Sequence, residues 1–130
     1  MKRLAVVGGG SWGTALAAVL SERFDQVRLW VYEADLAERM VRTRQNDIFL
    51  PGFVLSENIQ PTASLEVALD QADIVLSVMP SHHVRAVAGK MVSLIDPGLP
   101  IVSATKGIES HSLLRVSEVL GEVLGNPDRI

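Results

Sequence analysis

The sequence predicts a doubly wound α/β fold with a parallel central sheet, and three observations support this prediction. Short apolar segments rich in β-branched residues alternate with segments whose apolar residues recur every three or four positions. The first short segment ends at Gly8-Gly9-Gly10, a run typical of a tight turn. Parallel strands also need crossover connections, and these place helices on both faces of a sheet.

The first half of the chain contains two strand-helix units. Residues 3–7 are apolar and valine-rich, which predicts a buried strand. From Trp12 onward the apolar positions have helical spacing; they are Ala15, Leu16, Val19, Leu20 and Phe24. Residues 27–31 predict the second strand and residues 36–41 an amphipathic helix, before a polar stretch and an irregular segment at 48–57.

The second half continues the alternation. Residues 58–63 predict a short strand, which Pro61 restricts to a sheet edge because proline cannot donate a ladder hydrogen bond. The remaining expected strands are 74–78 and 101–104, and the remaining expected helices are 65–71, 84–95 and 113–124. Ser64 and Ser81 are the expected caps of the helices that follow them.

The usual strand order of this class is 3-2-1-4-5, which places the switch point between residues 3–7 and 74–78. Ligands of such sheets bind beyond the carboxyl ends of the strands. We therefore expect the loops that start at Gly8, Tyr32, Met79 and Thr105 to line one site.

Composition excludes several classes of function. The 130 residues suit one domain, with 48% apolar and 21% charged residues. The net charge of −3, without a block of like charges, disfavours nucleic-acid binding. The apolar stretches are far shorter than the roughly 20 residues that span a membrane, and no export signal precedes them. The absence of cysteine excludes disulfides and is compatible with the cytoplasm, which is the expected location.

The glycine-rich turn carries the main functional prediction. Gly8-Gly9-Gly10-Ser11-Trp12-Gly13 matches G-x-G-x-x-G between an expected strand and an expected helix, which is the context of a dinucleotide-binding loop. Gly8 would permit the turn, Gly10 would let a pyrophosphate approach, and Gly13 would let the helix pack on the strand. Free N–H groups near Ser11 and Trp12 would hold the phosphates. The alternative is a turn that needs glycine only for its backbone geometry.

Glu33 follows Gly13 by twenty residues, where a carboxylate can accept hydrogen bonds from the adenosine ribose. Its charge would repel a 2′-phosphate, and no Lys or Arg lies between Leu29 and Glu38. The sequence therefore predicts NAD or NADP as cofactor, with NAD preferred. The alternative is a solvated carboxylate that favours the dipole of the next helix.

Lys106 follows the last expected strand directly, so its ammonium group would reach the same crevice. It could attract a substrate phosphate or polarise a carbonyl, although a lone lysine is more often only solvated. His82 and His83 are adjacent and diverge around a helix, so we expect no metal site, with His83 near the adenosine.

The joint order of five motifs resembles that of NAD(P)-dependent glycerol-3-phosphate dehydrogenases. The motifs are Gly8 to Ala17, Leu29-Trp30, Phe49-Leu50-Pro51-Gly52, Met79-Pro80-Ser81-His82 and Ala104 to Glu109. The resemblance implies reversible hydride transfer between NAD(P)H and dihydroxyacetone phosphate, which gives the glycerol 3-phosphate of phospholipid synthesis. It also places Ser11 and Trp12 on the cofactor phosphates, Tyr32 near the adenosine, Phe49 near the cofactor, and Lys106 between cofactor and substrate, as the catalytic residue of this chain.

The family continues into a helical domain that supplies the general acid and most substrate contacts. We therefore expect residues 1–130 to be the dinucleotide-binding domain, inactive alone, and to self-associate through the edge left without its neighbour. A free-standing nucleotide-sensing module of the same fold is the alternative.

Overall fold

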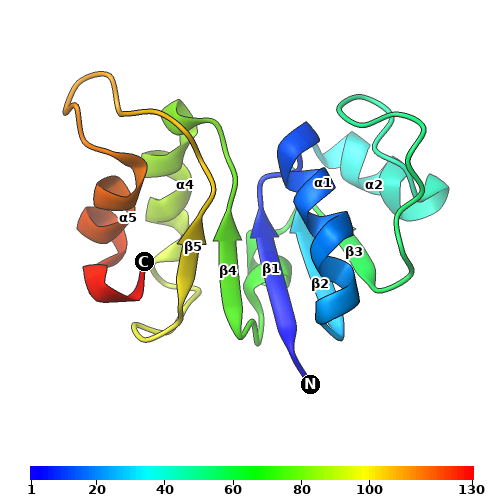
Figure 1. The fold of residues 1–130 in the computed structure, drawn as a ribbon, viewed down its shortest axis with the longest axis horizontal. Coiled ribbons are helices and arrows are strands. Elements are labelled where there is room, and N and C mark those ends of the chain that lie inside the picture. Colours follow the sequence, from blue (N-terminus) through cyan, green and yellow to red (C-terminus); the bar gives the residue numbers. More distant parts are fainter.

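The computed structural model describes residues 1–130 and contains one sheet of five parallel strands. Its order is β3-β2-β1-β4-β5, as predicted (Figure 1). The strands are β1 (Arg3–Val7), β2 (Gln26–Trp30), β3 (Ile59–Thr62), β4 (Ile74–Ser77) and β5 (Ile101–Ser103). Val7 pairs with Trp30 on one side and with Ser77 on the other, so three strands end together at the switch point.

The α-helices cover both faces of this sheet. They are α1 (Ser11–Leu20), α2 (Ala34–Thr43), α3 (Leu65–Leu69), α4 (Val84–Met91) and α5 (Val116–Leu124). Alternation along β1 builds both layers, because Leu4 and Val6 pack with residues of α1 and α2, whereas Ala5 and Val7 pack with residues of α3, α4 and α5. Successive side chains of a strand point to opposite faces, so four apolar residues of β1 serve two cores.

The short third strand confirms the prediction made from proline. Pro61 pairs with Leu29 on its inner side, and β3 is the outermost strand on that side of the sheet. The outer edge needs no N–H donor from Pro61. The next helix also begins as predicted, because the Ser64 hydroxyl accepts the N–H of Val67 at 3.2 Å.

Several helix boundaries and one cap differ from the sequence predictions. The helix expected over 65–71 ends at Leu69, and the one expected over 36–41 covers Ala34–Thr43. The helix expected over 84–95 ends at Met91 and continues as a turn in which Leu94 donates to the Met91 carbonyl. The helix expected from residue 113 begins at Val116, because Leu113 has a left-handed φ of 61°. The Ser81 cap was wrong, since Ser81 lies in a 3₁₀ turn and no side chain caps α4.

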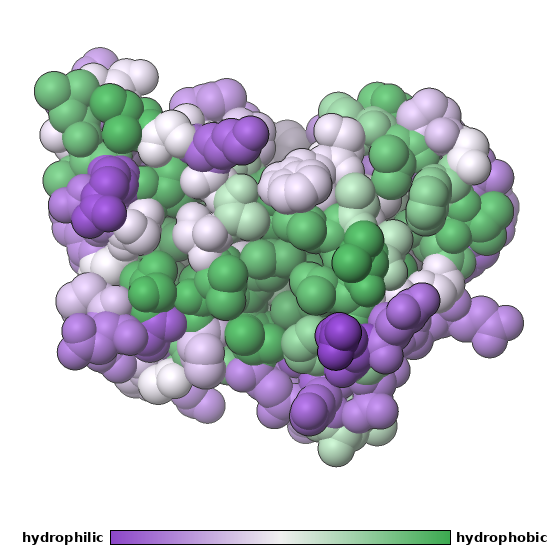
Figure 2. Space-filling model, in the orientation of Figure 1, coloured by the Kyte–Doolittle hydropathy of each residue, from purple (hydrophilic) through white to green (hydrophobic).

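Part of the sheet is uncovered on the α1 side. A shallow apolar groove of about 220 Å³ lies there, lined by Leu4, Leu20, Phe24, Ile74, Val75, Leu76 and Val102. Figure 2 shows the corresponding apolar surface near the middle of this face. None of the helices is both long and apolar enough to cross a bilayer.

Candidate functional site

A cleft of about 710 Å³ opens at the carboxyl ends of the strands. All ten residues that the sequence predicted for the site line this cleft, together with eight others. The predicted ten are Gly8, Gly10, Ser11, Trp12, Gly13, Tyr32, Glu33, Phe49, His83 and Lys106. The other eight are Gly9, Trp30, Val78, Met79, Pro80, Val87, Ala104 and Thr105. The four loops expected to converge therefore do converge on one cavity.

The glycine loop brings α1 into direct contact with the end of β1. Gly8 has a φ of 130°, a backbone conformation that other residues rarely adopt. A Cβ on Gly13 would lie 1.7 Å from the Gly8 carbonyl oxygen. Only a residue without a side chain fits there, so the loop can fold tightly beneath the cleft.

The amino end of α1 presents free donors to the cleft. The first helical bond runs from the Thr14 N–H to the Gly10 carbonyl at 2.9 Å, and no side chain caps the helix. The N–H groups of Ser11, Trp12 and Gly13 make no hydrogen bond within the chain. A Cβ on Gly10 would meet no atom within 4 Å, so space is open beside these amides. Together with the helix dipole they form an anion-binding end.

Aromatic rings form one side of the cleft. The Tyr32 and His83 rings are nearly parallel, at an interplanar angle of 12° with centroids 6.4 Å apart. Trp30 meets Tyr32 edge-on at 6.1 Å, and its Nε1 donates to the Ala63 carbonyl at 3.0 Å. Tyr32 is 74% exposed, whereas Trp30 is buried. The sequence analysis named Trp30 only within the Leu29-Trp30 motif and did not assign it to the site, because the second strand was expected to continue to residue 31, whereas β2 ends at Trp30.

The charged side chains of the cleft are Glu33 and Lys106. Glu33 is half-buried at the N-cap position of α2, but its carboxylate makes no capping bond and no ion pair. Lys106 is exposed, and its ammonium also has no partner in the chain. Both side chains are therefore free to contact a ligand, as they would also be if they were only solvated.

The loop that carries Lys106 is fastened to the two helices behind it. Arg85 of α4 donates to both carboxylate oxygens of Glu109, at 2.8 and 2.9 Å, and to Glu122 of α5 at 3.1 Å. The Arg85 guanidinium, with a further bond from Ser112, lowers the pKa of Glu109 to about 2. The same carboxylates raise the pKa of Arg85, so this network stays charged at neutral pH.

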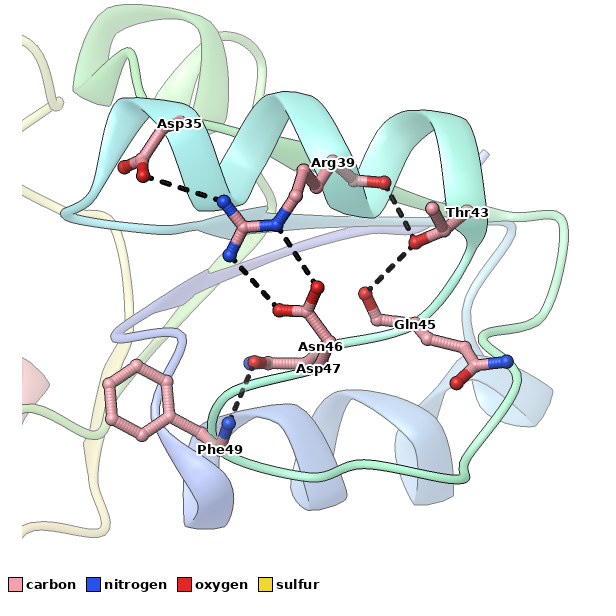
Figure 3. A network of polar contacts seen from close by, with 7 residues as sticks. All are labelled: Asp35, Arg39, Thr43, Gln45, Asn46, Asp47 and Phe49. Atoms are coloured by element: carbon pink, nitrogen blue, oxygen red, sulfur yellow. Dashed lines mark hydrogen bonds and ion pairs between the residues drawn. The ribbon is translucent and has the colours of Figure 1, made fainter.

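A segment that sequence reasoning treated as irregular supplies the wall at Phe49. Figure 3 shows the turn that begins at Asn46, where Arg39 of α2 donates to both oxygens of Asp47 at 3.0 Å. Asp35 adds a longer contact to Arg39 at 3.4 Å. The resemblance placed Phe49 near the cofactor, but it did not predict the bonds that hold this turn. The only sequence signal for those bonds was the run of polar residues before Phe49-Leu50-Pro51-Gly52.

The sheet order, the glycine loop at the switch point and the cleft above it define the class: a doubly wound α/β domain of the Rossmann type. A family model described as the N-terminus of NAD-dependent glycerol-3-phosphate dehydrogenase matches residues 3–130. The chain belongs to this family.

Named relatives agree with this assignment. A glycerol-3-phosphate dehydrogenase [NAD(P)+] of Koribacter versatilis is 47% identical over 95% of this chain and 37% of that protein. The enzyme of the same name from Syntrophobacter fumaroxidans is 44% identical over 93% and 36%. The crystal structure of glycerol-3-phosphate dehydrogenase from Coxiella burnetii matches with a TM-score of 0.89 at 36% identity, over 96% of this chain and 38% of that one. The chain thus spans a little over a third of the length of these relatives.

Proposed function

We propose that residues 1–130 form the dinucleotide-binding domain of a glycerol-3-phosphate dehydrogenase. The observation that carries this proposal is the convergence of all ten predicted residues on one cleft at the unpaired amino end of α1. The family assignment supports this proposal. The reaction proposed for the whole enzyme is the interconversion of dihydroxyacetone phosphate and glycerol 3-phosphate. A bound nicotinamide would supply or accept the hydride.

The geometry suggests a role for each part of the cleft. The amides of Ser11 and Trp12, beside the open space at Gly10, suit a pyrophosphate. Tyr32 and His83 suit the faces of an adenine ring, since aromatic rings favour stacked contacts with one another. Phe49 closes the cleft beside the glycine loop.

Lys106 is the residue of this chain that we assign to catalysis. Its free ammonium at the mouth of the cleft could hold the substrate phosphate or polarise the substrate carbonyl. General acid catalysis and substrate positioning each supply large parts of an enzyme's rate. The resemblance assigns both to the helical domain of the family, so we expect residues 1–130 by themselves to bind the dinucleotide without turnover. A steady-state assay that finds turnover at the relatives' rate would contradict this expectation.

NAD is the preferred cofactor in this proposal. Glu33, which follows β2, is the carboxylate that lines the cleft. Lys106 follows β5, at the other end of the sheet order, so its charge is not next to Glu33. Arg39 does not line the cleft and is engaged by Asp35 and Asp47. No guanidinium is therefore placed to neutralise a 2′-phosphate near the ribose.

Titration of the chain with NADH and with NADPH tests both the binding and the preference. We expect NADH to bind more tightly than NADPH. Glu33→Gln should reduce the ratio of the NADPH and NADH dissociation constants about tenfold, since removing the repulsion between Glu33 and the 2′-phosphate is worth about 1.4 kcal/mol. Glu22→Gln is the matched control, because Glu22 is exposed in the turn after the far end of α1. Failure of both dinucleotides to bind would refute the proposed function, and tighter NADPH binding would refute the preference.

Two further expectations belong to this proposal. The cytoplasm is the proposed location. Self-association is also proposed, through the apolar groove and the free edge of β5, where Val102 is 48% exposed. Sedimentation that finds only monomer at high protein concentration would remove the second expectation.

A further inference from the structure

One buried side chain, that of Asn46, joins two walls of the cleft. Asn46 has no exposed surface. Its Nδ2 donates to the Gly9 carbonyl and to the Thr14 hydroxyl, both at 2.9 Å. Its Oδ1 accepts the N–H of Phe49 at 3.0 Å. The side-chain amide thus bonds the glycine loop, α1 and the segment that carries Phe49, and it leaves neither its nitrogen nor its oxygen unpaired.

The bond to Gly9 fixes the direction of the next amide. The Gly9–Gly10 peptide is trans, as are all peptides of the chain. In a planar trans peptide the C=O and the N–H point in opposite directions. Because Asn46 holds the Gly9 carbonyl toward the interior, the Gly10 N–H points the other way. Gly10 lines the cleft, and its N–H has no acceptor within the chain.

The bond to Phe49 fixes a second wall of the cleft. The Leu50 N–H also donates to the Asn46 carbonyl, at 3.1 Å, so residues 46–50 form a closed turn. On the outside Asp47 is held by Arg39 of α2 (Figure 3). Within this frame Phe49 lies 39% exposed over the cleft.

We propose that Asn46 is a positioning residue of the cleft, which aims the Gly10 N–H at the ligand phosphates and sets the distance of Phe49 from them. The inference deepens the proposed function and depends on it for the binding measurement only. Asn46 touches no ligand in this proposal; it acts through Gly9 and Phe49.

Three variants of the chain test the proposal by NADH titration and by amide hydrogen exchange without ligand. Asn46→Ala removes all three side-chain bonds. Asn46→Asp keeps the acceptor for the Phe49 N–H but loses both donated bonds. Because aspartate has nearly the shape of asparagine, this variant serves as the test of binding if Asn46→Ala does not fold. Asn58→Ala is the matched control, because the Asn58 amide likewise donates two bonds, to the Ser21 carbonyl at 2.7 Å and the Phe24 carbonyl at 3.0 Å, but does not line the cleft.

We expect the NADH dissociation constant to rise about tenfold for Asn46→Ala, as the loss of a buried hydrogen bond predicts, and to stay unchanged for Asn58→Ala. Exchange of the Phe49 amide should become about tenfold faster in Asn46→Ala and stay slow in Asn46→Asp. Equal weakening by the Asn58 variant, or unchanged NADH binding by both Asn46 variants, would overturn the proposal. If the unsubstituted chain fails to bind NADH, the proposed function is wrong, and the exchange of Phe49 still decides the positioning role: an unchanged rate in Asn46→Ala overturns it.

Discussion

Replacement of Gly13 by alanine gives the sharpest test of how the cleft is built. The added Cβ would lie 1.7 Å from the Gly8 carbonyl oxygen and 2.9 Å from its carbon, whereas ordinary van der Waals contact begins at 3.4 Å. The obstacle is backbone, so no change of rotamer relieves it. The amino end of α1 would have to move away from β1 by about 1.7 Å.

The cost follows from packing energetics. Overpacking a core costs about 1–3 kcal/mol, and a contact with rigid backbone belongs at the upper end of that range. Alanine has a helix propensity about 1 kcal/mol better than glycine, which offsets part of the cost. We therefore expect Gly13→Ala to lower the free energy of unfolding by about 2 kcal/mol, together with weaker dinucleotide binding because the free amides of α1 are displaced.

Urea denaturation of three chains measures this effect. Gly89→Ala is the matched control, because Gly89 lies inside α4 and a Cβ there would meet no atom within 4 Å. The same substitution should raise the free energy of unfolding by about 0.5–1 kcal/mol at that position. Opposite signs at the two glycines would support the reasoning. An unfolding midpoint of Gly13→Ala at or above that of the unsubstituted chain, with an unchanged m-value, would refute it.

Three further predictions concern the cap, the ion-pair network and the phosphate end. Ser64→Ala removes the bond to the Val67 N–H and should cost about 1 kcal/mol in chemical denaturation; an unchanged midpoint would contradict the cap. Glu109 has its pKa lowered from 4.5 to about 2, so its ion pair stabilises the fold above pH 4.5, and the contribution is lost as the pH falls through about 2. The stability difference between the chain and Glu109→Gln should therefore fade over that interval in denaturation at stepped pH, and a constant difference would exclude the pair as its source. Gly10→Ala should leave the denaturation midpoint unchanged, because its Cβ would meet no atom within 4 Å. The same variant should bind NADH more weakly in a titration, and an unaltered affinity would place the pyrophosphate elsewhere.

The sequence predicted most of the fold because local pattern and topology agree in this class. Valine-rich runs predicted strands at the right places, and right-handed crossovers left one usual strand order. The boundaries were less accurate where a single dihedral angle decided them. Leu113 adopts a left-handed conformation that nothing in its residue type requires, so the start of α5 three residues later could not be predicted.

The sequence also predicted ten of the eighteen residues that line the cleft, nine of them from their place in the chain and Phe49 from the family resemblance. This was possible because parallel strands end at one edge of a sheet, so residues directly after strands must gather there. Residues that support the cleft loops without lining the cleft escaped the same reasoning. Asn46 and Arg85 look like ordinary polar residues in the chain, and only their partners, Gly9 and Glu109, show what they hold in place.

By itself the sequence determined which segments are strands, the order of the sheet and the edge at which the cleft opens, because periodicity and chain connectivity are local properties that fix global topology in a parallel sheet. Only the tertiary structure decided the contacts between segments distant in the chain: the Asn46 amide on the glycine loop 37 residues away, and the Arg85 guanidinium on Glu109 24 residues away. Such contacts form only when the two groups are buried together and their distance is correct to within a few tenths of an ångström. The spacing of residue types along the chain encodes neither condition.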